Sequence, residues 1–227
     1  MNEHQQQHYL AVVNYLKRAL ADGTLSVHQP IPSAAQLSQK LGFGETPVQE
    51  VLESLTTMGV LRDEGNEYFL NDDISATVAD LICLMLLSNR FSYQNLSHLR
   101  RSFEKSALPL ILENIEETTK NDLRSATLHM KLSENPNPKA DSVFHRRMAA
   151  ASGNALVACI SDAISYAMEL QITTIDEFDS ENTWQELVSI HEDLLEGLCT
   201  GDKARADAAL DAHYNLLDRQ IGRLPQE

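Results

Sequence analysis

The sequence predicts a mainly α-helical protein in which a winged helix-turn-helix is followed by an all-helical bundle of six or seven helices. The first 70 residues follow the order helix, helix, turn, helix, hairpin, which is that of a winged helix-turn-helix. A polar segment, NDDIS at 71–75, comes next. Beyond it, apolar residues recur only at helical spacing. We therefore expect one domain over residues 1–72 and a second over 76–227.

Two helices are predicted before the turn. Apolar side chains at helical spacing indicate the first helix over residues 8–21, which the pair Asp22-Gly23 ends. Ser33 and Gln36 have the spacing of a capping box, in which each side chain bonds the backbone of the other. This pair predicts a short second helix that runs through Lys40.

The third helix and the hairpin complete the first domain. Thr46 and Gln49 form a second capping-box pattern, with proline at the first helical position, and predict a helix over 47–58. The stretch GVLRDEGNEYFL then indicates two strands joined by a turn at Gly65-Asn66. These elements give the wing.

The second domain contains seven candidate helices. Breaks at SENPNPK, SGN and TGD separate the third helix from the fourth, the fourth from the fifth and the sixth from the seventh. The predicted helices span residues 76–89, 93–117, 120–132, 138–151, 154–171, 182–199 and 202–221.

The charge of the chain argues against nucleic acid as a partner. The net charge is −15, and both halves are acidic: 4 basic and 9 acidic residues lie up to Asp72, and 14 and 24 lie beyond it. Neutralisation of phosphates supplies most non-specific affinity for DNA, so an acidic balance lowers it. This expectation has to be weighed against the winged helix-turn-helix pattern.

The sequence also bears on compartment. No apolar run is long enough to span a bilayer, and the segment MNEHQQQHYL has neither a basic nor an apolar signal region. The three cysteines are widely spaced in apolar contexts, which is typical of reduced, buried thiols. We therefore expect a cytoplasmic protein with no membrane partner.

Three histidines and one carboxylate fall on the inward faces of the predicted helices. Asp141 and His145 are spaced i, i+4 and point the same way. His191 and His213 lie on the apolar stripes of the last two helices. One such histidine is usually a core residue, but three with a carboxylate favour a divalent metal. Neutral imidazole and carboxylate suit zinc, our first expectation, as well as nickel, iron or manganese.

Arg100 and Glu104 lie one turn apart on the predicted helix over 93–117. One interpretation is a surface ion pair that contributes a few tenths of a kcal/mol. The other is that Arg100 reaches into a pocket as a bidentate clamp for a carboxylate. Spacing alone does not decide between them. The apolar stripe that we expect to face inward beside them comprises Leu96, Leu99, Phe103 and Ala107.

Together these motifs resemble those of the GntR family of bacterial transcription regulators. The C-terminal half resembles the ligand-sensing FCD domain of the FadR-type subgroup. The matching residues are Arg100-x-x-Phe103-Glu104, then Asp141-x-x-x-His145 followed by ASGNALV, then His191 and His213.

The resemblance implies a function for the helical domain. A divalent metal would be held by Asp141, His145, His191 and His213, and a small organic acid would dock onto the metal. Arg100 would clamp this effector, in a binding set that also includes Glu104 and Asn154. The family resemblance also implies a homodimer.

The N-terminal half departs from the family pattern, which is close to P-S-E-R-x-L-A and then G-V-S-R-x-[TP]-V-R-E-A-L. The residues that specify the fold are retained, but the three arginines that contact DNA in the family are replaced by Ala35, Glu45 and Gln49. In the wing, Glu67 replaces the second glycine. Each lost phosphate contact lowers both the affinity for DNA and its salt dependence.

DNA binding of weak or altered specificity is the resulting expectation. Glutamine can pair with an adenine edge and glutamate can accept from cytosine N4, while hydroxyls can donate to phosphates. The candidate DNA-binding residues are Ser33, Lys40, Glu45, Thr46, Gln49 and Arg62.

Two alternatives remain at this point. In one, the helical domain is a metal- and carboxylate-binding sensor whose winged domain acts through a protein partner. In the other, the four metal ligands serve a hydrolase with Glu104 as base. The sequence contains no nucleophile or oxyanion motif, so we do not expect an enzyme.

Overall fold

A computed structural model describes residues 3–65, 67–88, 92–133, 138–172 and 181–221. These residues form ten helices and one two-stranded sheet, which confirms the mainly α fold class. They divide between Thr77 and Val78 into two compact units. Within the described ranges, none of the helices has the length and apolar character that crossing a membrane requires.

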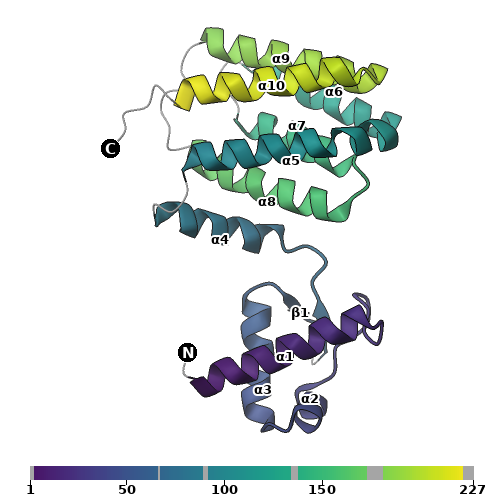
Figure 1. The fold of residues 1–227 in the computed structure, drawn as a ribbon, viewed down its shortest axis with the longest axis vertical. Coiled ribbons are helices and arrows are strands. Elements are labelled where there is room, and N and C mark those ends of the chain that lie inside the picture. Colours follow the sequence, from purple (N-terminus) through teal and green to yellow (C-terminus); the bar gives the residue numbers. More distant parts are fainter. Residues whose placement is uncertain (1–2, 66, 89–91, 134–137, 173–180, 222–227) are drawn as a thin grey trace. The chain divides into compact units, whose positions relative to one another are not determined.

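The first unit is a winged helix-turn-helix (Figure 1). Its elements are α1 (Glu3–Ala21), α2 (Ala34–Leu41), α3 (Glu45–Thr57), β1 (Leu61–Asp63) and β2 (Tyr68–Leu70). The three helices and the first strand surround one apolar core, which removes the apolar face of each helix from water. Core residues that are at most 5% exposed include Val12, Leu16, Leu37, Val48, Leu52, Leu55 and Leu61.

One of the two predicted capping boxes is confirmed. The backbone N–H of Ser33 donates to Gln36 Oε1 at 2.9 Å, and the Gln36 N–H donates to Ser33 Oγ at 3.3 Å. The second box is wrong, because α3 begins at Glu45 and is capped by Gly44 without a side-chain hydrogen bond. Pro47 is tolerated inside the first turn because the first N–H groups of a helix have no intrahelical partner.

The wing is a short antiparallel hairpin. Leu61 pairs with Leu70, and Asp63 pairs with Tyr68. The Glu64 N–H donates to the Glu67 carbonyl at 2.9 Å across the turn. Asn66, which we expected in this turn, lies outside the described residues.

The second unit is a helical bundle (Figure 1). Helix α10 packs on α9 and α5, while α7 packs on α8 and α6. Six to seven helices were expected, and seven are described, each within a few residues of its predicted bounds. They are α4 (Ser75–Leu87), α5 (Tyr93–Asn114), α6 (Glu117–Leu132), α7 (Pro138–Ala150), α8 (Ala155–Ile172), α9 (Glu181–Thr200) and α10 (Lys203–Ile221).

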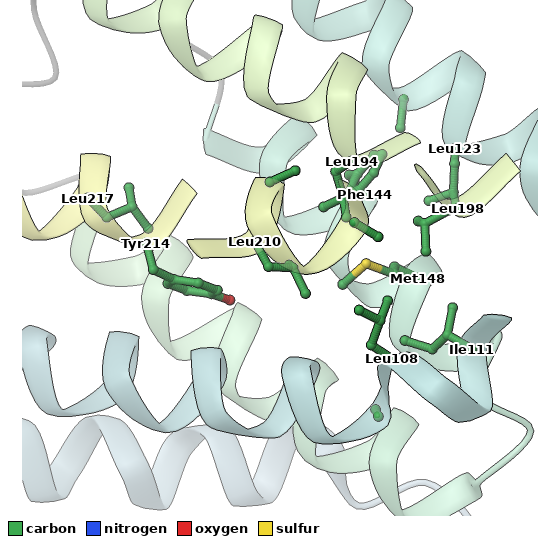
Figure 2. Close-up of a cluster of buried hydrophobic side chains, with 14 residues drawn as sticks. Leu108, Ile111, Leu123, Phe144, Met148, Leu194, Leu198, Leu210, Tyr214 and Leu217 are labelled. Carbon is green, nitrogen blue, oxygen red and sulfur yellow. The ribbon is translucent and has the colours of Figure 1, made fainter. Parts of the chain in front are cut away.

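The main core of the bundle is shared by α5, α6, α7, α9 and α10 (Figure 2). Phe144, Met148 and Leu194 are among its fully buried side chains. Gly197 allows α9 and α10 to approach closely: a Cβ at this position would lie 2.7 Å from the backbone nitrogen of Ala206. The last two helices therefore pack backbone against backbone.

The predicted inward stripe of α5 is confirmed at Leu96 and Ala107, which are buried, but is wrong at Leu99. Leu99 is 48% exposed, whereas Arg100 and Glu104 are each 1% exposed. The helix is rotated so that its charged pair faces the core together with Leu108 and Ile111. Burial of such a pair is tolerated when hydrogen bonds satisfy both groups.

Candidate functional site

Helices α7, α9 and α10 bring the four predicted metal ligands together inside the bundle. Asp141 and His145 come from α7, His191 from α9 and His213 from α10. One nitrogen or oxygen from each residue lies within 4.8 Å of all the others. The three imidazoles are fully buried and Asp141 is 7% exposed. The inward direction that helical phase predicted for these four side chains is therefore confirmed.

Hydrogen bonds on the outer side of two imidazoles fix their tautomers. His145 Nδ1 lies 2.9 Å from both carboxylate oxygens of Glu104. His191 Nδ1 lies 2.8 Å from the carbonyl oxygen of Leu187. A carboxylate and a carbonyl only accept hydrogen bonds, so Nδ1 carries the hydrogen in both rings. In the neutral rings each Nε2 is then an acceptor that faces the interior of the cluster.

Acceptor atoms consequently face one another across the cluster. His145 Nε2 and His191 Nε2 are 3.3 Å apart, and Asp141 Oδ1 is 3.2 Å from His191 Nε2. Asp141 Oδ1 and both ring nitrogens of His213 have no hydrogen-bond partner among the described residues. Ligand atoms about 2 Å from a tetrahedral ion lie roughly 3.3 Å apart. The donor set and its spacing therefore fit a divalent cation.

The protonation states also suit metal ligands. Burial lowers the pKa of His213 well below its usual value, and the other two histidines lower it further. Burial and the charge of Arg100 lower the pKa of His145. Burial alone would raise the pKa of the Asp141 carboxyl, but its histidine neighbours hold it well below the usual value. These pKa shifts favour neutral imidazoles at His145 and His213 and an ionised carboxylate at Asp141, the forms that bind metals.

Glu104 joins the cluster to α5 and α10. Its carboxylate accepts from Arg100 Nε at 3.1 Å and from the Tyr214 hydroxyl at 2.7 Å, besides His145. Burial raises its pKa, but His145 and Arg100 lower it more, so the net shift is downward. Figure 2 shows Tyr214 on α10 as a member of the buried apolar cluster. Its role was missed, because a tyrosine in an apolar stripe looks like an ordinary core residue.

Arg100 lies beside the cluster and not on the surface, which excludes the surface ion pair. Its Nη1 is 3.7 Å from Asp141 Oδ2 and 3.6 Å from Met168 Sδ on α8. With neutral imidazoles, the buried charges of Arg100, Glu104 and Asp141 leave one net negative charge in this interior. A net charge in an interior is costly, which further favours a bound cation.

Asn154 is placed apart from these buried residues. It is exposed, and its Oδ1 accepts from the backbone N–H groups of Leu156 and Val157 at the start of α8. This is the arrangement of a helix N-cap. Its predicted contact with an effector stays a prediction.

In the winged unit, three predicted DNA contacts lie exposed at helix starts. Ser33 caps α2, and Glu45 and Thr46 lie in the first turn of α3. The N–H groups of a helix start can bind a phosphate, whereas Glu45 would repel it. The surface thus keeps donors but places a negative charge beside them.

The other three predicted DNA contacts have partners within the unit. Lys40 Nζ donates to the Tyr15 hydroxyl at 2.7 Å but remains exposed. Gln49 Nε2 donates to Glu53 Oε1 at 2.9 Å and to the Tyr68 hydroxyl at 2.8 Å. Arg62 pairs with Glu64 at 2.7 Å. Gln49 on the reading helix α3 and Arg62 on the wing, both expected to contact DNA, therefore already have partners within the unit.

Comparison with known proteins gives concordant results for both units. Residues 95–216 match the FCD domain, and residues 8–67 match the bacterial regulatory proteins of the gntR family. The HTH-type transcriptional regulator LutR of Bacillus subtilis (strain 168) is 24% identical over 204 residues, which cover 86% of this chain and 92% of the relative.

Two solved structures share the fold. Streptococcus agalactiae GntR aligns with a TM-score of 0.66 at 17% identity, over 95% of this chain and 99% of that one. Lar, described as controlling the Listeria monocytogenes agr system, aligns with a TM-score of 0.51 at 18% identity over 99% of both chains. At these identities the likeness concerns the fold alone.

The central position of Glu104 leads to a prediction about stability. We expect Glu104→Ala to lower the free energy of unfolding by about 3–5 kcal/mol, because it removes the nearer carboxylate partner of the buried Arg100 and the acceptor of the Tyr214 hydroxyl. Urea unfolding followed by circular dichroism measures the change. Glu113→Ala, at an exposed position of the same helix, serves as control and should stay within about 0.5 kcal/mol of the unsubstituted chain. Equal effects of the two substitutions would contradict the role of Glu104.

Proposed function

Since the chain belongs to the gntR family of bacterial regulatory proteins and carries a C-terminal FCD domain, we propose that this transcription regulator senses a small organic acid at a metal site and reads operator DNA through its winged unit. The observation that carries the proposal is the set of buried acceptor atoms that face one another. The family and the LutR relative indicate a regulator and not an enzyme.

The metal would be held by Asp141, His145, His191 and His213. Zinc is the first expectation, with nickel, iron or manganese as alternatives. Glu104 and the Leu187 carbonyl orient two of the imidazoles from outside, the usual arrangement behind a metal-bound histidine. When bound, the ion supplies a positive centre that a carboxylate oxygen can approach.

The effector would be an anion, as the charges of the site indicate. The buried side chains carry one net negative charge, which a divalent ion converts to one net positive charge. A single carboxylate neutralises that charge. Arg100, whose Nη1 is 3.7 Å from Asp141 Oδ2, would hold this carboxylate next to the metal ligands.

The regulator would act as a homodimer. Helix α4 packs Ile82 and Cys83 on the bundle but exposes a row of large apolar side chains, which a second copy would cover. The exposed residues of this row are Leu81, Leu84 and Met85, which follow the i, i+3, i+4 spacing of a helix face. Effector binding would favour one arrangement of the dimer and so set the spacing of its two winged units.

A second candidate function is kept because of the surface of α3. Glu45, Glu50 and Glu53 are exposed there, and the amide of Gln49 is engaged by Tyr68. In this candidate the helical unit still senses a metal and a carboxylate, but the winged unit acts through a protein partner. Measurement of DNA binding separates the two candidates.

For the metal site, we predict that Zn²⁺ titrated into chelator-treated protein binds with one ion per chain. His213→Gln should weaken this affinity more than about 100-fold, since loss of an outer partner alone costs about 10- to 100-fold. Calorimetry gives the affinity. Because the His213 ring nitrogens accept or donate no hydrogen bond within the described part of the chain, the metal-free variant should unfold at or above the temperature of the metal-free parent.

The control for this experiment is His129→Gln, an exposed histidine of α6 outside the cluster, which should leave the zinc affinity unchanged. Elemental analysis of the purified protein identifies the resident metal. Absence of zinc, nickel, iron and manganese binding in the parent chain would refute the site.

For DNA binding, we predict that Glu45→Arg/Gln49→Arg strengthens binding to DNA. Two added phosphate contacts should make the slope of log affinity against log salt about 1.8 more negative. Fluorescence anisotropy at about 50 and 200 mM salt, with the DNA upstream of the protein's own gene, measures both quantities. Glu116→Arg/Thr118→Arg adds the same charge to an exposed part of the helical unit and should have a smaller effect.

Saturable binding by the parent chain in the presence of competitor DNA would support a regulator with altered specificity. If only the Arg variant binds, the protein-partner candidate is favoured.

For the dimer, we predict that Leu84→Glu raises the dissociation constant at least about tenfold, a change of 1.4 kcal/mol, because a charge would enter an apolar interface. Analytical ultracentrifugation follows the monomer–dimer equilibrium. Leu132→Glu is the control, since Leu132 is also highly exposed, at 70%, but lies on α6. A parent chain that stays monomeric at every concentration would rule out the dimer.

A further inference from the structure

Four buried serine hydroxyls of the helical unit have no hydrogen-bond partner among the described residues. Their side chains are at most 2% exposed. A buried hydroxyl in a helix commonly donates to the carbonyl one turn before it, as Thr127 does to Leu123 at 2.9 Å. The four that do not are Ser97 on α5, Ser142 on α7, and Ser161 and Ser165 on α8.

These serines lie on the helix faces that carry the site. Ser97 precedes Arg100 by three residues, and residues three or four apart share one face of a helix. Ser165 precedes Met168 by three residues, and the Met168 sulfur is 3.6 Å from Arg100 Nη1. Both α5 and α7 pack on α8. Ser97 and Ser165 therefore share the faces of α5 and α8 that carry Arg100 and Met168.

Ser142 and Ser161 fit the same pattern. Ser142 directly follows Asp141 and precedes His145 by three residues, and Ser161 lies one turn before Ser165. Polar groups buried without partners are rare in folded proteins, and each calls for an explanation. An apolar effector would leave all four hydroxyls without partners, whereas an oxygen-rich effector would supply them.

We propose that the effector is a hydroxylated monocarboxylic acid. Its carboxylate engages Arg100 beside the metal ligands, and its hydroxyl groups exchange hydrogen bonds with the serines of α5, α7 and α8. This inference rests on the proposed function, which requires only a carboxylate. Hydroxyl groups suit neutral partners that both donate and accept, as serine does.

The same charges disfavour a second carboxylate. With a divalent ion bound, the buried residues balance one negative charge, and Arg100 is the only buried cationic side chain of the described ranges. A dicarboxylate would add an uncompensated charge to this interior. An unsubstituted alkanoate would match the charge but leave the serines unsatisfied.

Acids of equal chain length provide the test. Calorimetry on the zinc-loaded full chain would compare butanoate, succinate and the 2-, 3- and 4-hydroxybutanoates. At least one hydroxybutanoate should bind about tenfold or more tightly than butanoate and succinate. Butanoate or succinate binding as tightly as every hydroxybutanoate would overturn the inference and leave the proposed function intact. Failure of every acid to bind would overturn both.

Serine variants separate the hydroxyl contacts from direct binding of the acid's hydroxyl to the metal. In Ser161→Ala and Ser165→Ala, the preference for the best hydroxybutanoate over butanoate should fall to within about twofold. Their unliganded forms should unfold at the same or a higher temperature, since an unpaired buried hydroxyl is removed. Ser125→Ala, an exposed serine of α6, should keep the full preference. A full preference in both α8 variants would overturn the role of the serines.

Discussion

Lone pairs that face one another in a buried interior repel, and the helical unit places several of them together. The Nε2 atoms of His145 and His191 are 3.3 Å apart because their Nδ1–H groups are held by Glu104 and the Leu187 carbonyl. Neither ring can turn its hydrogen inward without losing an outer bond. A positive centre relieves this repulsion, so α7, α9 and α10 are held in positions that a cation stabilises.

The two units differ in how their charges are arranged. In the helical unit the charged side chains of Arg100, Glu104 and Asp141 are buried, and Arg100 pairs with both carboxylates. The winged unit has kept the apolar core of its fold, but its reading helix exposes acidic side chains. Because fold stability rests on the core and affinity for phosphate rests on surface charge, the two properties vary independently.

Much of this arrangement follows from the sequence. Helical phase places His191 and His213 inward, because each lies on an apolar stripe, and the i, i+4 spacing puts Asp141 on the same side of its helix as His145. The same logic failed on α5, where it favoured Leu99 over Arg100: a charged pair satisfied by His145 and Tyr214, far away in the chain, cannot be recognised from local hydrophobicity. The four buried serines were not predicted for a similar reason, since the sequence does not show whether a serine hydroxyl has a hydrogen-bond partner.

The close packing at Gly197 has a consequence for how the helical unit opens. Helices α9 and α10 meet backbone to backbone there and should detach from the bundle as one cooperative segment. That segment carries His191 and His213, whereas Asp141 and His145 stay with α7. An ion bound by all four residues would hold the segment of α9 and α10 to α7. Amide hydrogen exchange in the last two helices would then report the occupancy of a site whose ligands are spread over three helices.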